Sequence, residues 1–123
     1  MLKLLLDEHI SPRVAAGLRR RDSGISVQCF AEWENGGLLG QDDAACLAAT
    51  GLRGWTLVTY DRRTIPRILK QWGEENRHHA GVIFVDEKTL APDDIGGLVC
   101  ALAALFKSAR HWDWKDRICF LRR

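Results

Sequence analysis

Acidic residues come at the ends of three apolar segments of the sequence. They are Asp7 and Glu8 after Leu2–Leu6, Asp61 after Trp55–Thr59, and Asp86 after Gly81–Val85. A short apolar run bounded by polar residues is typical of a buried strand in a parallel sheet. Parallel strands that are linked by helices end at one edge of the sheet, where the ligands of such proteins bind. We therefore expect Asp7, Asp61 and Asp86 to lie along one rim of the molecule.

Two further acids, Asp42 and Asp43, precede the alanine-rich segment Ala44–Thr50. A helix that starts there enters the sheet on the same side as the strand ends, so its acids join the rim. Several carboxylates at one place repel one another unless a cation lies between them. Hard oxygen ligands of this kind suit Mg²⁺ or Mn²⁺, with substrate phosphate oxygens completing the shell. Such a metal activates a water molecule and stabilises a phosphodiester under attack, so hydrolysis of a phosphodiester is the chemistry that these residues predict.

Helix capping and receiver-like chemistry also place acids at such positions. Acidic residues favour helix N-termini, which accounts for Asp42, Asp43, Asp93 and Asp94. Ser11 and Thr64 stand nearer the expected helix starts than Asp7 and Asp61 do, so these two acids are the stronger candidates for a site. A receiver-like phosphoacceptor has similar acids, but the sequence lacks the hydroxyl residue after the fourth strand and the lysine after the last strand that such proteins need.

The elements that must position these residues alternate between strands and helices. Strands are expected at Leu2–Leu6, Ile25–Phe30, Trp55–Thr59, Gly81–Val85 and, at an edge, Arg117–Leu121. Helices are expected at Arg13–Arg21, Ala44–Thr50 and Thr64–Asn76, with a last helix after Pro92 that includes Ile95 to Ala109. This alternation predicts an α/β fold with a doubly wound, mostly parallel five-stranded sheet flanked by helices. The 123 residues suffice for one domain, residues 1–123.

Composition and charge narrow the class of protein. A hydrophobic content of 46% and a charged content of 28% are ordinary for a globular protein. The net charge of +2 gives no signal for polyanions, so local clusters must carry any binding of nucleic acid. An apolar strand that begins at residue 2 leaves no room for a signal peptide, and the longest apolar run, Leu98–Phe106, is shorter than the ~20 residues that span a bilayer. We expect a cytoplasmic protein with no membrane partner.

The four cysteines show none of the spacings of a zinc site or a disulfide framework. They lie in apolar surroundings, at Cys29, Cys46, Cys100 and Cys119. Buried thiols that act as small hydrophobic residues are therefore expected.

Basic residues near the third strand are candidates for holding a nucleic-acid backbone. The set comprises Arg13, Arg62, Arg63, Arg67 and Lys70. Spacings of three and four residues place Arg63, Arg67 and Lys70 on one helix face, and contacts to phosphate position a strand without reading its sequence. A solvated helix face is the alternative. The tryptophans Trp33, Trp112 and Trp114 could stack on bases or anchor a partner protein, although core packing explains Trp33 equally well.

Three stretches of the chain resemble a known family when they are taken in order and spacing. They are LLLDEHISPRVAAGLRRR, QDDAACLAATGLRGWTLVTYDRRT and GVIFVDEKTL. Together they resemble the DUF5615 family of PIN-like proteins, from residue 2 to about residue 106. The Leu-Leu-Asp-Glu start and the Thr-x-Asp after the third strand are the sharpest parts of this resemblance.

The resemblance implies both an activity and a set of site residues. PIN-like domains are typically ribonucleases that depend on Mg²⁺ or Mn²⁺, and many are toxins of toxin–antitoxin pairs. By this resemblance Asp7 is the first metal ligand, Asp42 or its neighbour Asp43 is the acid on the helix, and Asp61 is the acid after the third strand. Glu8 then orients the attacking water or holds a second ion. RNA is the implied substrate, an antitoxin is an implied partner, and a homodimer is compatible with this class.

The sequence departs from the family pattern at two positions. His9 stands where the family commonly has Asn, and Arg63 stands where it often has a second Asp. The cation of Arg63 competes with a metal, although it is also able to bind phosphate. Either the site is a reduced one completed by Glu8 or Asp86, or the chain is a catalytically decayed module that binds RNA or protein.

Overall fold

The computed structural model describes residues 1–123 and contains one five-stranded sheet. The strands are β1 (Leu4–Leu6), β2 (Val27–Cys29), β3 (Thr56–Thr59), β4 (Val82–Val85) and β5 (Ile118–Leu121). The α-helices are α1 (Pro12–Arg21), α2 (Asp43–Leu52), α3 (Thr64–Glu74) and α4 (Ile95–Ala109). A short 3₁₀ turn, η1, spans Trp33–Asn35. All strand pairs are parallel, in the order β2-β1-β3-β4-β5, which confirms the predicted α/β sheet and its edge strand.

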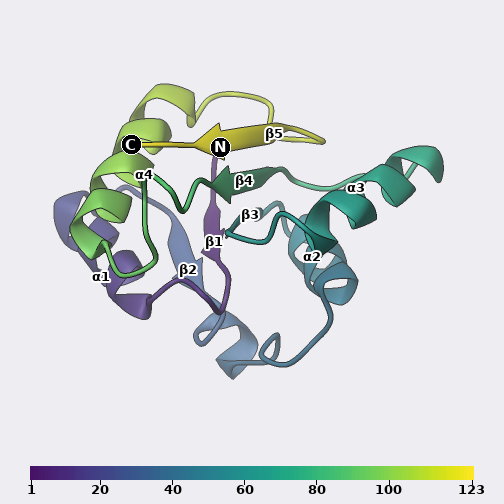
Figure 1. The fold of residues 1–123 in the computed structure, drawn as a ribbon, viewed down its shortest axis with the longest axis horizontal. Helices are drawn as coiled ribbons and strands as arrows, with labels where there is room; N and C mark the ends of the chain where they lie inside the picture. The colour runs from purple at the N-terminus through teal and green to yellow at the C-terminus, as the bar shows by residue number, and fades with distance from the viewer.

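Helices cover both faces of the sheet (Figure 1). α1 and α4 pack on one face, and α2 and α3 pack on the other. β1 is an interior strand of the sheet, with Leu4 and Leu6 in the core beneath α1 and α4 and Leu5 in the core beneath α2 and α3. Because successive side chains of a strand point to opposite faces, a strand covered on both sides is apolar throughout. This explains the unbroken leucine run at the start of the chain.

The strand order reverses direction between β1 and β3. The chain leaves β1 through α1 to β2 on one side, and then returns through α2 to β3 on the other side of β1. In open α/β sheets the loops after two such strands diverge and leave a crevice at the carboxyl ends of the strands. In open α/β sheets this reversal point is where ligands bind.

Local signals fix most of the helix starts. The side chain of Ser11 accepts a hydrogen bond from the Arg13 N–H at 3.2 Å, and Pro12 occupies the first helical position of α1. Asp42 caps α2 by accepting from the Ala45 N–H at 2.7 Å, and Asp94 caps α4 by accepting from the Gly97 N–H at 2.9 Å. The expected capping role of Asp42 and Asp94 is confirmed.

The loop before α2 buries its tryptophan. Trp33 is only 4% exposed and packs edge-on against Trp55, with 5.5 Å between the ring centroids. It belongs to the core beneath α2 and α3 together with Leu38 from the same loop. Of the two roles that the sequence left open for Trp33, core packing is the one that the structure supports.

The thiols follow the sequence prediction in part. Cys29 and Cys46 are buried and Cys119 is half-buried, but Cys100 is exposed on α4. All four are free. The expectation of burial is wrong for Cys100, which lies on the solvent side of an otherwise apolar helix. No helix of the protein combines the length and the apolar character needed to cross a membrane.

Candidate active site at the ends of β1 and β3

Asp7 follows β1 directly and is almost fully buried, at 8% exposed. Its Oδ1 accepts a hydrogen bond from the His9 N–H at 2.9 Å, and its Oδ2 accepts one from the Thr59 hydroxyl at 2.5 Å. Burial raises the pKa of Asp7, while the bonds from Thr59 and His9 act in the opposite direction. The result is a carboxylate that is fixed in orientation and costly to ionise.

Asp61 lies two residues beyond β3 and is half-buried. Its Oδ1 accepts from the N–H groups of Arg63 and Thr64, both at 2.8 Å. Burial alone raises the pKa of Asp61, but these bonds outweigh it and the net shift is downward. Arg63 occupies the N-cap position of α3 and offers no side-chain acceptor. Asp61 therefore stabilises the start of α3, and the expectation that it stands clear of helix capping is wrong.

Asp43 is the first residue of α2 and approaches Asp61 across the crevice. Burial raises the pKa of Asp43, and the charge of Asp61 and a hydrogen bond to it raise this pKa further. Asp7 adds a smaller repulsion in the same direction. Asp43 and Asp61 thus form a pair of carboxyl groups whose ionisation is coupled, with Asp7 nearby.

The choice between Asp42 and Asp43 follows from the packing of α2. Asp42 is exposed and its carboxylate caps the helix, so Asp43 is the acid that faces the crevice. Asp43 lies three and four residues before the buried Cys46 and Leu47, which puts all three on one helix face. That spacing was the signal in the sequence, but the surrounding alanines hide which face of this helix is buried.

Negative charge accumulates where the end of β1 and the start of α2 meet. Burial and the nearby carboxylates raise the pKa of the Cys46 thiol to about 11. The carboxylates that contribute are Asp43, Asp42, Glu8 and Asp7. Glu8 itself is exposed beside Asp7 and also raises the pKa of Asp7 slightly. Both predicted residues after β1 therefore lie at the crevice.

These carboxylates suit a divalent cation in donor type. The repulsion from Asp61 that raises the pKa of Asp43 is what Mg²⁺ or Mn²⁺ would relieve, because both ions prefer carboxylate oxygens. The side chains, however, do not form a finished cage. No group of three or more His, Cys, Asp or Glu residues is arranged so that it could hold a metal ion. The metal site stays a prediction.

Asp86 stays outside this group of acids. Its Oδ1 accepts from the Lys88 N–H at 3.2 Å and its Oδ2 from the Thr89 hydroxyl at 3.3 Å. These bonds close the loop after β4. Asp86 follows a parallel strand as expected, but β4 lies one strand beyond the point where the sheet order reverses.

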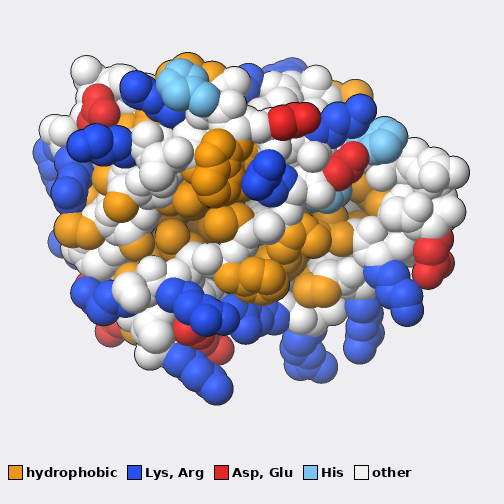
Figure 2. Space-filling view, turned by 90° about the horizontal axis from the view of Figure 1, so that it is seen from above, with side chains coloured by type: hydrophobic (Ala, Val, Ile, Leu, Met, Phe, Trp, Pro, Cys, Tyr) orange, Lys and Arg blue, Asp and Glu red, His pale blue; other side chains and the backbone are white.

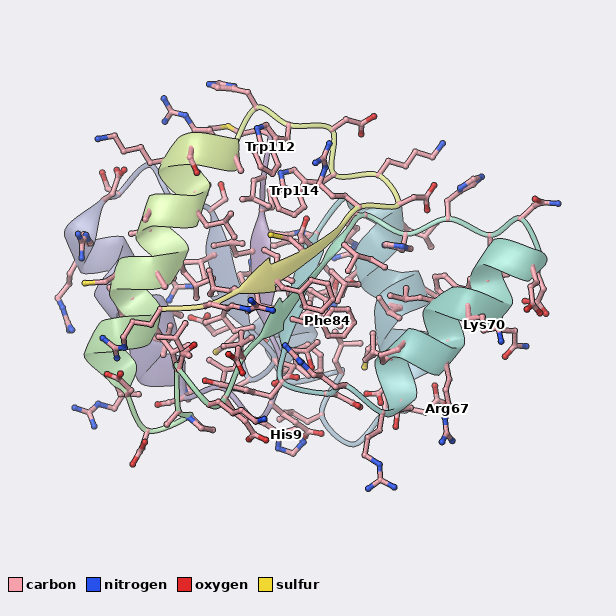
Figure 3. All side chains as sticks on the ribbon, turned by 45° about the horizontal axis from the view of Figure 1, so that its top comes forward. His9, Arg67, Lys70, Phe84, Trp112 and Trp114 are labelled. Atoms are coloured by element: carbon pink, nitrogen blue, oxygen red, sulfur yellow. The ribbon has the colours of Figure 1, made fainter.

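The basic residues that the sequence predicted to bind nucleic acid differ in what surrounds them. Figure 3 shows Arg67 and Lys70 on the solvent side of α3, and His9 at the same end of the sheet as Arg67. Arg63 is exposed next to Asp61 and forms no ion pair, so its charge is available at the crevice. Arg62 instead places its guanidinium over the ring of Phe120, 5.4 Å from the centroid. Arg13 is exposed at the start of α1.

The C-terminal tryptophans lie far from the acids. The rings of Trp112 and Trp114 stack at 5.9 Å, and Trp114 donates from Nε1 to the Ala109 carbonyl at 2.9 Å. Figure 3 shows both at the end of the sheet opposite His9. They line a cavity of about 860 Å³, which His78 and His79 border at the turn before β4. These tryptophans therefore lie outside the candidate site at Asp7.

Comparisons with known proteins gave no match that bears on this site. No family model matches the chain, and neither a curated protein nor a solved structure matches it at a significant level. The resemblance to DUF5615 and PIN-like proteins stays a prediction that rests on the three sequence stretches. The class that the structure itself defines is a parallel α/β fold with acids at its topological reversal point.

Proposed function

We propose that this protein is a PIN-like, metal-dependent ribonuclease that acts on RNA in the cytoplasm. Its activity fits the toxin of a toxin–antitoxin pair, as the resemblance implies. The observation that supports it is the meeting of three acids from three elements. Asp7 after β1, Asp43 from α2 and Asp61 after β3 come together at the reversal point of the sheet, where the charges of Asp61 and Asp7 both raise the pKa of Asp43.

Each acid has its own part in this proposal. Asp7 stays oriented through Thr59 and His9, so it presents a fixed oxygen donor. Asp43 and Asp61, whose ionisation is coupled, become the other two ligands. Mg²⁺ or Mn²⁺, when bound, supplies an activated water and stabilises charge on the phosphate. Glu8 is exposed beside Asp7 and orients the attacking water.

The basic residues position the RNA. Arg63 at the crevice contacts the phosphate that is attacked, and Arg67 on the next turn of α3 holds the backbone beyond it. Contacts of this kind give affinity that falls steeply with salt and does not depend on base sequence. Arg13 at the start of α1 extends this surface on the other side of β1.

The test combines binding and cleavage. Titration calorimetry with Mn²⁺ and cleavage of a labelled RNA are measured for the wild type, Asp7→Asn, Asp61→Asn and the control Asp86→Asn. Mn²⁺ binding and RNA cleavage should both be lost in Asp7→Asn and Asp61→Asn. Both should be kept in Asp86→Asn, because the Asp86 carboxylate is used within its own loop. Circular dichroism checks that each variant folds. Cleavage retained by Asp7→Asn would refute this site.

A binding module without catalysis is the second candidate. Two observations favour it: Asp61 already uses one carboxylate oxygen to stabilise α3, and Arg63 brings a positive charge to the place where the metal would lie. This candidate predicts that the protein binds RNA with the same affinity in EDTA and in Mn²⁺, and never cleaves it. The ribonuclease proposal predicts that EDTA stops cleavage.

A further inference from the structure

β5 leaves one side of its backbone without a partner. It is the last strand of the sheet and pairs only with β4. The Val82 N–H donates to the Arg117 carbonyl at 3.0 Å, and the Asp86 N–H donates to the Leu121 carbonyl at 2.9 Å. Because backbone groups alternate in direction along a strand, Ile118 and Phe120 turn their N–H and C=O groups away from the sheet. Such an edge is ready to accept another strand.

The side chains of this edge are apolar and exposed. Ile118 is 47% exposed and Phe120 is 56% exposed, although Phe120 stacks on Phe84 with 5.7 Å between centroids. Both point to the α3 face, where a groove of about 490 Å³ separates them from Pro66 and Leu69 of α3. Figure 2 shows this side of the molecule, with a hydrophobic surface among Lys and Arg side chains. Natural edge strands generally avoid this combination of open backbone and exposed apolar residues.

The charged residues that line the groove are both positive. Arg62 and Lys70 line it, and no acidic residue does. The strand itself is flanked by Arg117 and Arg122. Arg62 lies over the ring of Phe120, so its charge is held directly at the apolar surface. An occupant that carries carboxylates therefore complements this edge.

A second copy of the chain complements this groove less well than an acidic segment does. Its β5 edge carries Arg62, Lys70, Arg117 and Arg122 as well, so it adds positive charge where an acidic segment adds negative charge.

We propose that β5 and the adjoining groove bind an extended acidic segment of a partner protein, which adds to the sheet as a sixth strand. Backbone groups of the segment pair with Ile118 and Phe120, its apolar side chains enter the groove beside Leu69, and its carboxylates meet Arg62 and Lys70. This surface lies at the β5 edge, beyond β3 and β4 from β1. The proposal therefore stands independently of the ribonuclease activity.

Peptide binding tests the chemistry of the occupant. Fluorescence anisotropy is measured with a labelled peptide of Thr-Val-Thr-Glu repeats, which puts valine and glutamate on the same face of a strand. It is compared with the same peptide carrying lysine in place of glutamate, and with a glutamate peptide that has a central proline. The acidic peptide should bind and weaken with added salt, while the other two should not bind. Failure of the acidic peptide to bind, or equal binding of the lysine peptide, would overturn the proposal.

Variants test the place of binding. Ile118→Pro removes an N–H that points away from β4, so it spares the existing ladder and should weaken the acidic peptide about tenfold. Phe120→Asp puts a carboxylate on the groove and should weaken binding of the acidic peptide as well. It provides the test if the proline variant does not fold. Arg62→Glu with Lys70→Glu should reverse the preference toward the lysine peptide. Leu52→Glu is the control, because Leu52 is 90% exposed but lies outside this groove, and it should bind as the wild type does.

The oligomeric state supplies the remaining outcome. Sedimentation of the wild type should show a monomer, and Ile118→Pro should sediment in the same way. A dimer that Ile118→Pro dissociates would mean that a second copy covers β5, and the proposal would then be wrong.

Discussion

The Thr59 hydroxyl donates a hydrogen bond of 2.5 Å to the carboxylate of Asp7. The same oxygen accepts a bond from the Asp61 N–H at 3.0 Å, so one buried hydroxyl links two of the three acids. The parallel register of β1 and β3 brings them together, since Leu6 lies opposite Val58 and the next residues follow in step. Thr59 is thus a positioning residue for the candidate site.

Thr59→Val should disturb both the site and the stability of the protein. The valine keeps the shape but leaves Asp7 Oδ2 without its donor and the Asp61 N–H without an acceptor, which should cost about 1–3 kcal/mol of unfolding free energy. Mn²⁺ affinity should fall as well. Thr56→Val is the matched control on the same strand: its hydroxyl bonds to the Ala80 carbonyl at 2.7 Å, so stability should fall but Mn²⁺ binding should not. Equal Mn²⁺ affinity in both variants would remove Thr59 from the site.

Asp7→Asn should stabilise the protein at neutral pH. Burial raises the pKa of Asp7 in the folded state above the unfolded value of about 3.8, so ionising it costs stability as the pH rises through the folded pKa. The neutral Asn avoids this cost, and urea unfolding should show a gain of about 1 kcal/mol near pH 7. The gain should vanish at pH values below the unfolded pKa, where Asp7 is protonated in both states. A gain that is independent of pH would contradict this prediction.

Asp43→Asn should weaken Mn²⁺ binding by roughly tenfold or more, the loss typical when a metal site is disturbed. Asp42→Asn should leave it nearly unchanged, because asparagine also caps helices and the Asp42 side chain serves α2. Calorimetry on the two variants measures the difference between neighbouring acids. In the wild type the affinity should increase with pH, since the pKa values of Asp7 and Asp43 are raised and both must lose protons to bind metal. If Asp42→Asn proved the more damaging change, the assignment of Asp43 would be wrong.

Arg63→Asp should strengthen Mn²⁺ binding. It removes a positive charge beside Asp61 and adds a carboxylate, and a change of this size near the protein surface should raise the affinity about tenfold. Arg67→Asp makes the same charge change one turn further along α3 and should have a much smaller effect on the ion. Calorimetry compares the two directly. Similar gains in Mn²⁺ affinity in the two variants would mean that net charge causes the effect and that the position of Arg63 does not matter.

The sequence by itself determined the architecture of this protein. The leucine run of β1, the alternating strands and helices, and the Ser11-Pro12 start of α1 are local signals, and each depends on burial or capping within a few residues. These signals also predicted that Asp7 and Asp61 follow strands and share one rim of the sheet. Apolar runs and caps suffice here because a strand buried on both faces has one sequence pattern.

Only the tertiary structure decided which side chains meet. Thr59 and Asp7 are 52 residues apart, and their bond depends on the register of two strands that no local pattern specifies. The choice of Asp43 over Asp42 depends on the rotation of α2 about its axis, which packing of Cys46 and Leu47 sets. The burial of Trp33 against Trp55 likewise comes from the way a glycine-rich loop folds back on the sheet. These contacts arise between distant segments, so the physical cause lies in packing and not in the neighbouring sequence.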